Sequence, residues 1–505
     1  MSNPAPGYSD GGRGHKYQEV PQQNVASDRF DNRDDQYELQ SLDDLDYEHE
    51  AEDEAEDEAE HEAEYETQNE EQAKRKGSNM VMAFFNIANS ILGAGIIGQP
   101  LAFKYCGVVG SIVVLLLLTV LVDWTMLIII KNAELSRTNS YQDTVYKCFG
   151  VPGKLLLLIS ICSFGFGGCI AFCVIIGDTI PHVLKAFLPE SITSLHSYTG
   201  WLFRRNSIIV LCTCCISYPL CLNRNISRLA KASGFALLGM LIIVSLAVVR
   251  GALVEKSLKG DLSRSEWTFN PKVFQGISVI SFAMVCHHNI IFIYNSMKDR
   301  SVKNFSFLTH VVTTFSMICC FVMGFGGLLT FGDKTKGNVL NNFKSDDQWI
   351  NVARFFFGAN MLTTLPLEVF VVRDLVKDII LFIFSRKKSD HELSTLNHFI
   401  LTTFLLFTSM FVSLFTCNLG MIFELIGAIS ASLMAYILPP SCFLKLSYEA
   451  TTYRKWSDVS RHFLIYKVLP SVSCIIFGAL IMVIGSYTTI VNYSQSDGSE
   501  HCVEN

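Results

Sequence analysis

The sequence predicts an all-α polytopic membrane protein, built from two five-helix halves of opposite orientation plus an eleventh helix. Three observations lead to this fold class. Half of the 505 residues are hydrophobic and only 17% are charged, a balance untypical of soluble domains. Eleven apolar segments follow one another along the chain, each long enough for the roughly 20 residues that a helix needs to cross a bilayer. The segments also recur at a regular offset, which indicates an internal repeat.

The amino-terminal stretch differs in composition from everything after it. The first 79 residues hold 24 acidic and 7 basic side chains, whereas the other 426 hold 23 acidic and 33 basic. Residues 48–71 are a run of Ala-Glu and Asp-Glu repeats with too little apolar surface to fold. We therefore expect residues 1–77 to be a disordered acidic tail that either solvates the chain or docks a cytosolic regulator. The basic residues of the body are spread and form no stripe, which excludes a nucleic-acid binder.

A membrane domain is expected over residues 78–490, followed by a short tail at 491–505. The first half covers about 80–250, the second about 273–444, and the extra helix 466–490. The predicted spans are 80–102, 107–130, 155–179, 206–222, 232–250, 273–296, 307–331, 349–372, 396–417, 421–444 and 466–490.

Orientation follows from the basic residues in the connections. With a cytosolic amino terminus, the inside segments contain 23 Lys and Arg and the outside connections contain 11. This bias favours a cytosolic amino terminus. With an odd number of spans, the carboxyl terminus is then expected on the extracellular or lumenal side.

The repeat relates the first five spans to the second five. Spans 1 and 6, 3 and 8, 4 and 9, and 5 and 10 begin at offsets of about 189–194 residues. Because five is odd, the second half enters the membrane upside down, which is the inverted-repeat plan of many transport folds. In that plan the first helix of each half is broken near mid-membrane, where freed backbone groups bind ligands.

The first span carries helix-weakening residues at its centre. Between Asn86 and Pro100 it contains three glycines within six positions, together with Asn89 and Ser90. Glycines at such density are costly in a helix unless the unwinding has a use. Close helix packing through small residues is the alternative interpretation.

The sixth span matches the first in kind. Ser281, Phe282 and Ala283 precede a polar run that includes His287 and His288. Two imidazoles beside a polar break indicate a functional site rather than a packing role.

Four carboxyls also fall inside spans, where an ionisable group usually faces a pathway or a partner. Asp178 lies near a helix end and is expected in contact with water, whereas Glu424 is expected in the first turn of the tenth span, at the positive end of its dipole. In the eighth span, Thr363 and Thr364 could provide oxygen ligands for a monovalent cation or could bond to their own helix. The four carboxyls are Asp123, Asp178, Glu368 and Glu424.

Two motifs resemble those of the amino acid/auxin permease family. The first is the N-x-x-N-x-x-x-G-x-G-I-x-x-x-P string from Asn86 to Pro100, and the second is Cys286-His287 with Ile293-Tyr294 further on. The likeness is greatest to fungal vacuolar amino acid transporters and to sodium-coupled neutral amino acid transporters, and it covers residues 78–490. The chain departs from the sodium-coupled pattern at His288-Asn289, where those relatives have Pro-Glu.

The resemblance implies a LeuT-type fold and a set of site residues. The substrate's carboxylate and amino group would be held by the unwound stretches of spans 1 and 6. Asn89 and Thr364, with Thr363 adjacent, match the sodium ligands, whereas the fungal members exchange protons, for which His287 and Glu424 are the candidates. The implied substrate residues are Asn89, Ser90, Gly93, Ala94, Gly95, Ser281, Phe282 and Ala283.

The predicted function is therefore secondary active transport of neutral amino acids by alternating access, coupled to protons or sodium. The alternative is a non-transporting amino acid sensor on the same fold. We predict no enzyme activity, because no nucleophile, base or metal set converges, and no cofactor or metal beyond a sodium ion at Asn89 and Thr364. Membrane lipids surround the domain. The family likeness favours the vacuole or another endomembrane, with the plasma membrane as the alternative.

Overall fold

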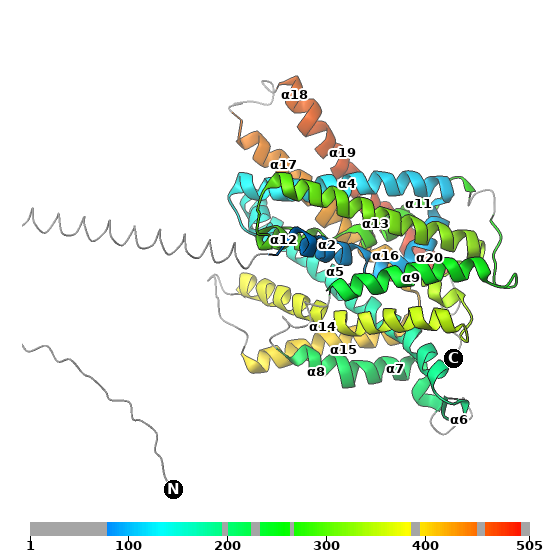
Figure 1. Ribbon diagram of the computed structural model, residues 1–505. Helices are drawn as coiled ribbons and strands as arrows, with labels where there is room; N and C mark the ends of the chain where they lie inside the picture. The colour runs from blue at the N-terminus through cyan, green and yellow to red at the C-terminus, as the bar shows by residue number, and fades with distance from the viewer. Residues whose placement is uncertain are drawn as a thin grey trace, which may run out of the picture. The chain divides into compact units, whose positions relative to one another are not determined.

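The computed structural model describes residues 78–193, 200–223, 233–262, 267–384, 394–451 and 460–495. Within these ranges the chain is helical and forms no strand, and one isolated bridge joins Ser78 to Met297. The predicted acidic tail and the last ten residues lie outside the described ranges. Helices that lie side by side form the membrane domain (Figure 1).

Eleven helices within the described residues are long and apolar enough to cross a membrane, which confirms the predicted number. We call the face where the first span begins the amino-terminal face and the face where the last span ends the carboxyl-terminal face. In chain order the spans are α2 (Met80–Leu92) with η1 (Ala94–Gly98) and α3 (Gln99–Cys106); α4 (Val108–Ser136); α5 (Tyr141–Phe187); α7 (Arg205–Cys212) with η3 (Thr213–Ser217) and α8 (Tyr218–Leu222); α9 (Ser233–Leu253); α11 (Val273–Met284) with η5 (His287–Asn289) and α12 (Ile290–Ser296); α13 (Val302–Phe331); α14 (Gln348–Phe384); α15 (Thr395–Phe415); α16 (Leu419–Ile426) with η8 (Gly427–Ile437) and α17 (Leu438–Glu449); and α18 (Arg461–Phe463) with η10 (Leu464–Val468), α19 (Leu469–Leu480), η11 (Ile481–Gly485) and α20 (Ser486–Gln495).

The third span begins earlier than predicted, at Tyr141 instead of about 155. The Ser140 side chain caps this helix by accepting a hydrogen bond from the Asp143 amide at 3.0 Å, a local signal that hydropathy does not detect. The helix then bends at Gly150, whose φ of 63° is accessible to glycine at little cost. Polar residues at 141–154 therefore belong to a helical extension and not to a loop.

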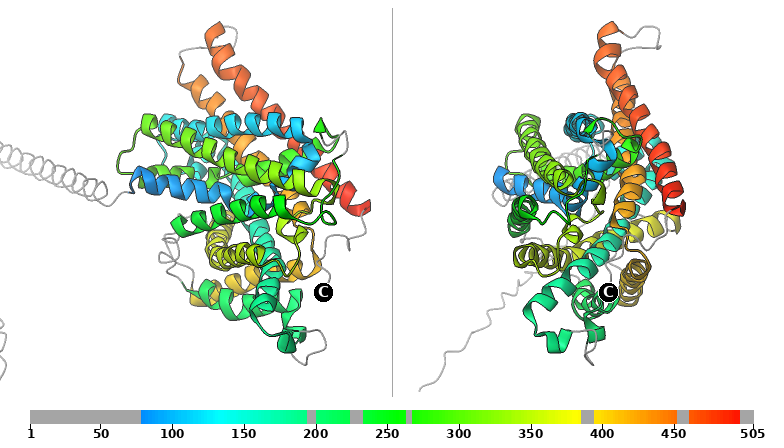
Figure 2. Two further views of the ribbon diagram at one scale, coloured as in Figure 1. Left: turned by 45° about the vertical axis from the view of Figure 1, so that its right-hand side comes forward. Right: turned by 90° about the vertical axis from the view of Figure 1, so that its right-hand side faces the viewer.

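Apolar side chains cover the outward surfaces of the helices. Val120 on α4 is 67% exposed and Phe307 on α13 is 62% exposed, as expected where lipid replaces water. The last span contributes little to the interior. In the right-hand view of Figure 2 it runs, coloured orange to red, along the side of the other helices.

A buried ion pair joins three spans near the carboxyl-terminal face. The Arg205 Nε lies 3.1 Å from the Asp178 Oδ1, and their side chains are only 6% and 3% exposed. Arg205 also donates to the carbonyls of Ser413 and Thr416, at 3.2 and 3.0 Å, while Asp178 accepts from Asn341 at 2.9 Å. The expectation that Asp178 is in contact with water was wrong, because α7 and the segment before α14 cover it.

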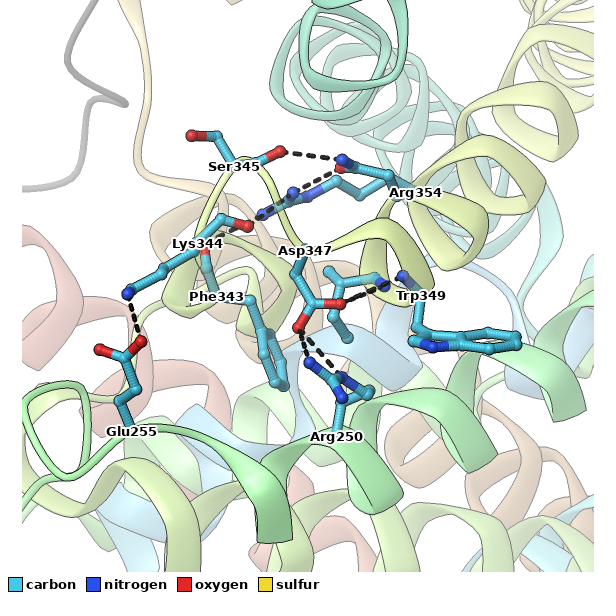
Figure 3. A network of polar contacts seen from close by, with 10 residues as sticks. Arg250, Glu255, Phe343, Lys344, Ser345, Asp347, Trp349 and Arg354 are labelled. Carbon is cyan, nitrogen blue, oxygen red and sulfur yellow. Dashed lines mark hydrogen bonds and ion pairs between the residues drawn. The ribbon is translucent and has the colours of Figure 1, made fainter. Parts of the chain in front are cut away.

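A second polar network fixes the position of the segment between α13 and α14 (Figure 3). Arg250 at the end of α9 donates to Asp347 at 2.7 Å, and Asp347 also accepts from the Trp349 and Ile350 amides that begin α14.

On the surface, the hydrogen bond from Lys344 lowers the pKa of the Glu255 carboxyl. This exposed ion pair therefore stabilises the fold slightly at pH values above the ordinary pKa of a glutamate. The stabilisation is lost as the pH falls through the lowered pKa of Glu255.

Arg354 of α14 is fully buried and binds the same segment between α13 and α14. It donates to the Leu340 and Phe343 carbonyls, at 2.8 and 3.1 Å, and to the Asn351 side chain at 2.7 Å. Replacing Arg354 by methionine is expected to destabilise the protein by about 2–4 kcal/mol, because buried carbonyls then lack donors. Thermal unfolding in detergent measures this effect. A melting temperature equal to that of the unmodified protein would show that the network is dispensable.

Candidate functional site

The first span is broken where its glycines cluster, which confirms that part of the prediction, but Asn89 and Ser90, which were expected in the unwound stretch, still lie within α2. α2 ends at Leu92, Gly93 leaves the helical region with ψ near −135°, and the chain continues as the 3₁₀ turn η1 before α3 begins at Gln99. The Gln99 side chain donates to the Gly95 carbonyl at 3.2 Å. Carbonyl and amide groups around Gly93 therefore lie outside a continuous α-helix, as a ligand site in a membrane requires.

The sixth span is also broken, but further along than predicted. α11 continues to Met284, Val285 is extended with ψ 117°, and η5 follows from His287. Ser281, Phe282 and Ala283 therefore form the last helical turn, which the Val285 amide closes by donating to the Ser281 carbonyl at 3.1 Å. The expectation that these three residues are unwound was wrong. Val285 and Cys286, which favour helices less than alanine does, occupy the unwound position.

The two broken spans touch next to their breaks. A Cβ atom added to Gly95 would lie 2.5 Å from the Ala283 Cβ and 2.6 Å from its Cα. Only glycine allows η1 to approach α11 this closely. The contact brings the freed groups of span 1 within reach of the end of α11, as the inverted-repeat plan expects.

Several predicted residues present groups that could meet a ligand. The Asn89 Oδ1 is buried and has no hydrogen-bond partner in the structure. Ser90 and Gly93 are partly exposed, and the atom nearest to a Cβ on Gly93 would be the Asn89 carbonyl oxygen at 3.5 Å. Ala94 is nearly buried. Asn89 therefore offers an unpaired amide oxygen in the last turn of α2, one turn before the break at Gly93.

The two threonines of the eighth span bond to their own helix. Thr363 is exposed and donates to the Asn360 carbonyl at 2.9 Å, and Thr364 donates to the same carbonyl at 2.8 Å. α14 packs mainly along α5 and α9, and α2 packs mainly along α9 and α13. No hydrogen bond between Asn89 and Thr364 is recorded among the described residues. Their shared sodium site therefore stays a prediction.

His287 is fully buried in the second break and is oriented by α4. Its Nε2 lies 2.8 Å from the Thr125 hydroxyl, whose own hydrogen bonds to the Leu121 carbonyl at 2.8 Å. The His287 Nδ1 is buried and has no hydrogen-bond partner within the described residues.

An aromatic group lies beside the breaks. The Phe164 ring is 5.6 Å from that of Phe282 and 5.4 Å from that of His288. Phe282 stacks on Phe423 of α16, with ring centroids 4.5 Å apart and planes at 17°. Ser281 meets the Tyr436 hydroxyl of η8 at 3.2 Å. These rings could contact the side chain of a substrate, while the backbone breaks contact its charged groups.

Glu424 follows Phe423 in α16 and is 3% exposed. It is in the second turn of α16 and not in the first, because Asn418 caps the helix from further upstream. Its Oε2 accepts from Gln275 at 2.9 Å and from Thr489 at 2.8 Å. Two neutral donors therefore hold the carboxyl, and the positive end of the helix contributes less than predicted.

Comparison with known proteins decides the family. Residues 76–491 match the model of the transmembrane amino acid transporter protein family. The chain belongs to this family. It is 46% identical to vacuolar amino acid transporter 2 of Saccharomyces cerevisiae, over 85% of this chain and 86% of that protein. It is 32% identical to the putative sodium-coupled neutral amino acid transporter 11 of Bos taurus, over 82% and 83%, and 24% identical to the sodium-coupled neutral amino acid symporter 2 of Danio rerio, over 72% and 75%.

Membership in this transporter family confirms the predicted class of integral, multi-pass membrane transporter and the prediction that the chain is not an enzyme. Within the described residues, no group of three or more His, Cys, Asp or Glu side chains is arranged to hold a metal ion.

Sequence reasoning missed four residues near the breaks. Phe164 lies in a run that is rich in glycine, Gly165, Gly167 and Gly168, a signal for close packing in a membrane. Thr125, Phe423 and Tyr436 lie in ordinary apolar segments, where nothing in the local pattern distinguishes them. Their proximity to the breaks arises only from the packing of α4, α16 and η8 around α11.

Proposed function

We propose that this transporter is a secondary carrier that moves neutral amino acids by alternating access. The observation that carries the proposal is the contact between two broken helices at Gly95 and Ala283. Half-helix ends present partial charges of both signs, which suits the carboxylate and the ammonium of an amino acid. The names of the relatives favour transport over the alternative of a sensor that binds without moving its ligand.

The phenylalanines beside the breaks support the choice of neutral substrates. Phe164, Phe282 and Phe423 offer apolar surface and no counter-charge to a substrate side chain. A cationic or anionic side chain would lose its hydration there without gaining an ion pair.

The coupling ion is either a proton or sodium. His287 supports proton coupling, because its imidazole lies beside the second break and its Nδ1 is buried without a partner among the described residues. Glu424 is the second proton candidate. Asn89 supports sodium coupling through its unpaired oxygen, with Thr364 and Thr363 as the predicted further ligands. The two mechanisms differ in which of these residues transport requires.

We further propose a vacuolar or other endomembrane location with the amino terminus in the cytosol. The yeast relative named as vacuolar supports the location, and the excess of basic residues in the inside connections supports the orientation. In this arrangement the acidic tail would meet a cytosolic regulator, and the carboxyl-terminal face would be lumenal. The two halves would form the five-plus-five inverted repeat of LeuT-type carriers, which the breaks in spans 1 and 6 support.

Uptake of radiolabelled neutral amino acids into liposomes that contain the purified full-length protein tests this function. Asn89→Ala and Gly93→Leu are each expected to reduce uptake to background, because they remove the unpaired oxygen or fill the space beside it. Folding is checked by gel filtration and thermal unfolding. Retained transport in both variants would disprove the site assignment.

The same liposomes distinguish the ions. Flux driven by a pH gradient without sodium, and lost in His287→Gln, would support proton coupling. Flux that needs sodium and survives His287→Gln would assign coupling to Asn89 and Thr364. Specific binding of an amino acid without net flux would instead support the sensor alternative.

A further inference from the structure

The tenth span places an aromatic ring between the helix breaks and the carboxyl-terminal face. Phe423 is fully buried, stacks on Phe282, and lies so close to Gly98 that an added Cβ there would be 2.9 Å from its ring. Gly98 follows the break at Gly93 on the way to that face. Phe423 therefore fills the space between η1 and α11 on one side of the candidate site.

Between this ring and the carboxyl-terminal face, α3 and α11 pack closely against each other. A Cβ on Gly276 of α11 would lie 2.8 Å from the Ala102 carbonyl oxygen of α3 and in contact with the Cys106 Sγ. Cys106 is fully buried and its thiol faces the Val273 carbonyl at 3.7 Å. The outer parts of the two broken spans, α3 and α11, are thus packed together, and Cys106 lies within their interface.

Glu424, the neighbour of Phe423, connects this closed region to the last span. Gln275 of α11 donates to Glu424 at 2.9 Å and accepts from Asn492 of α20 at 3.0 Å. Thr489 of α20 donates to Glu424 at 2.8 Å. These hydrogen bonds form a chain that begins and ends on α20, because both Asn492 and Thr489 are donors from that helix.

The last span can reach these groups because its backbone comes close. A Cβ on Gly485 would lie 2.7 Å from the Ser278 hydroxyl of α11 and 3.2 Å from the Ala428 Cβ of η8. Thr489 is one turn further along and is 2% exposed. The other groups that interact with Glu424 are Lys272 and Tyr105, and no ion pair with Lys272 is formed among the described residues. Hydrogen bonds, rather than charge pairing, hold the carboxyl.

We propose that the eleventh span is a positioning element of a gate on the carboxyl-terminal face. Asn492 and Thr489 hold Gln275 and Glu424, and this fixes α16 against α11 so that Phe423 stays stacked on Phe282. α3 is linked to the same group through Tyr105, which interacts with Glu424, so an opening toward this face that separates α3 from α11 disturbs the chain at Glu424. The identification of this region as a gate rests on the proposed transport function. The hydrogen bonds that join Asn492, Thr489, Gln275 and Glu424, which we call the latch, can be tested without transport.

Cys106 is a natural reporter of the gate. A thiol reagent can reach it only when α3 and α11 separate, and mass spectrometry distinguishes its peptide from the other cysteines. Losing one hydrogen bond of ordinary strength changes an open–closed equilibrium about fivefold. In purified protein, Asn492→Ala and Thr489→Val are each expected to accelerate labelling of Cys106 by a maleimide about fivefold.

Two variants serve as matched controls. Ser494→Ala removes the same glycosylation sequon as Asn492→Ala, Asn492-Tyr493-Ser494, but Ser494 bonds only to its own helix, at the Val491 carbonyl. Thr489→Ser keeps the hydroxyl. Both are expected to label Cys106 at the rate of the unmodified protein. An effect shared by Ser494→Ala and Asn492→Ala would assign the change to glycosylation and overturn the latch.

Transport measurements separate this inference from the proposed function. A latch that favours closure lowers the apparent affinity from the carboxyl-terminal face, so Asn492→Ala should lower the KM measured from that face about fivefold. Unchanged labelling and unchanged KM in both Asn492→Ala and Thr489→Val, with folding intact, would overturn the latch. Accelerated labelling in a protein that moves no amino acid would support the latch and disprove the transport function.

Discussion

Gly95→Ala is expected to reduce transport at least about tenfold, although it adds a single methyl group. The new Cβ would lie 2.5 Å from the Ala283 Cβ and 2.6 Å from its Cα. Because part of this clash is with backbone, no side-chain rotation relieves it, and η1 must move away from α11. Overpacking of this kind costs about 1–3 kcal/mol, and the middle of this range, about 2 kcal/mol, corresponds to roughly a thirtyfold change in an equilibrium.

Uptake into liposomes, normalised to folded protein, measures the effect. Gly239→Ala is the matched control, because Gly239 also lies within a span and the nearest atom to its added Cβ would be 3.9 Å away, on Phe356. This variant is expected to transport normally. If Gly95→Ala also transports normally, the close contact between the two breaks is not needed for transport.

Of the buried residues whose substitution we predict, Arg205 is expected to cause the largest loss of stability when it is removed. Arg205→Ala leaves the Asp178 carboxyl buried without its charge partner and frees the carbonyls of Ser413 and Thr416. Breaking a buried pair from one side costs about 3–5 kcal/mol, a large fraction of the stability of many proteins. We expect low expression and a melting temperature reduced by many degrees.

Two comparisons make this prediction specific. Arg205→Lys keeps the charge but not the planar fork that reaches Asp178 and two carbonyls, so an intermediate loss is expected. Lys344→Ala removes the exposed pair with Glu255 and is expected to leave the melting temperature unchanged. Equal melting temperatures for Arg205→Ala and Lys344→Ala would contradict the structural role of the buried pair.

The sequence alone was sufficient to predict the elements that depend on local composition. The eleven spans follow from runs of apolar residues, because a helix must satisfy its own backbone hydrogen bonds in lipid. The break of span 1 follows from Gly93, Gly95 and Gly98, since glycines weaken a helix wherever they occur. The resemblance to the amino acid/auxin permease family followed in part from the same glycine motif, and the family comparison confirms it. All of these signals lie within a few neighbouring residues.

Only the tertiary structure decided which distant residues meet. Asp178 of α5 pairs with Arg205 of α7, His287 beside the second break lies 2.8 Å from the Thr125 hydroxyl of α4, and Phe423 of α16 stacks on Phe282 of α11. Glu424 was recognised as a candidate, but its donors Gln275 and Thr489 come from two other spans. Hydropathy locates helices but says nothing of how they rotate and pack against one another, and that packing determines the partner of each buried polar group.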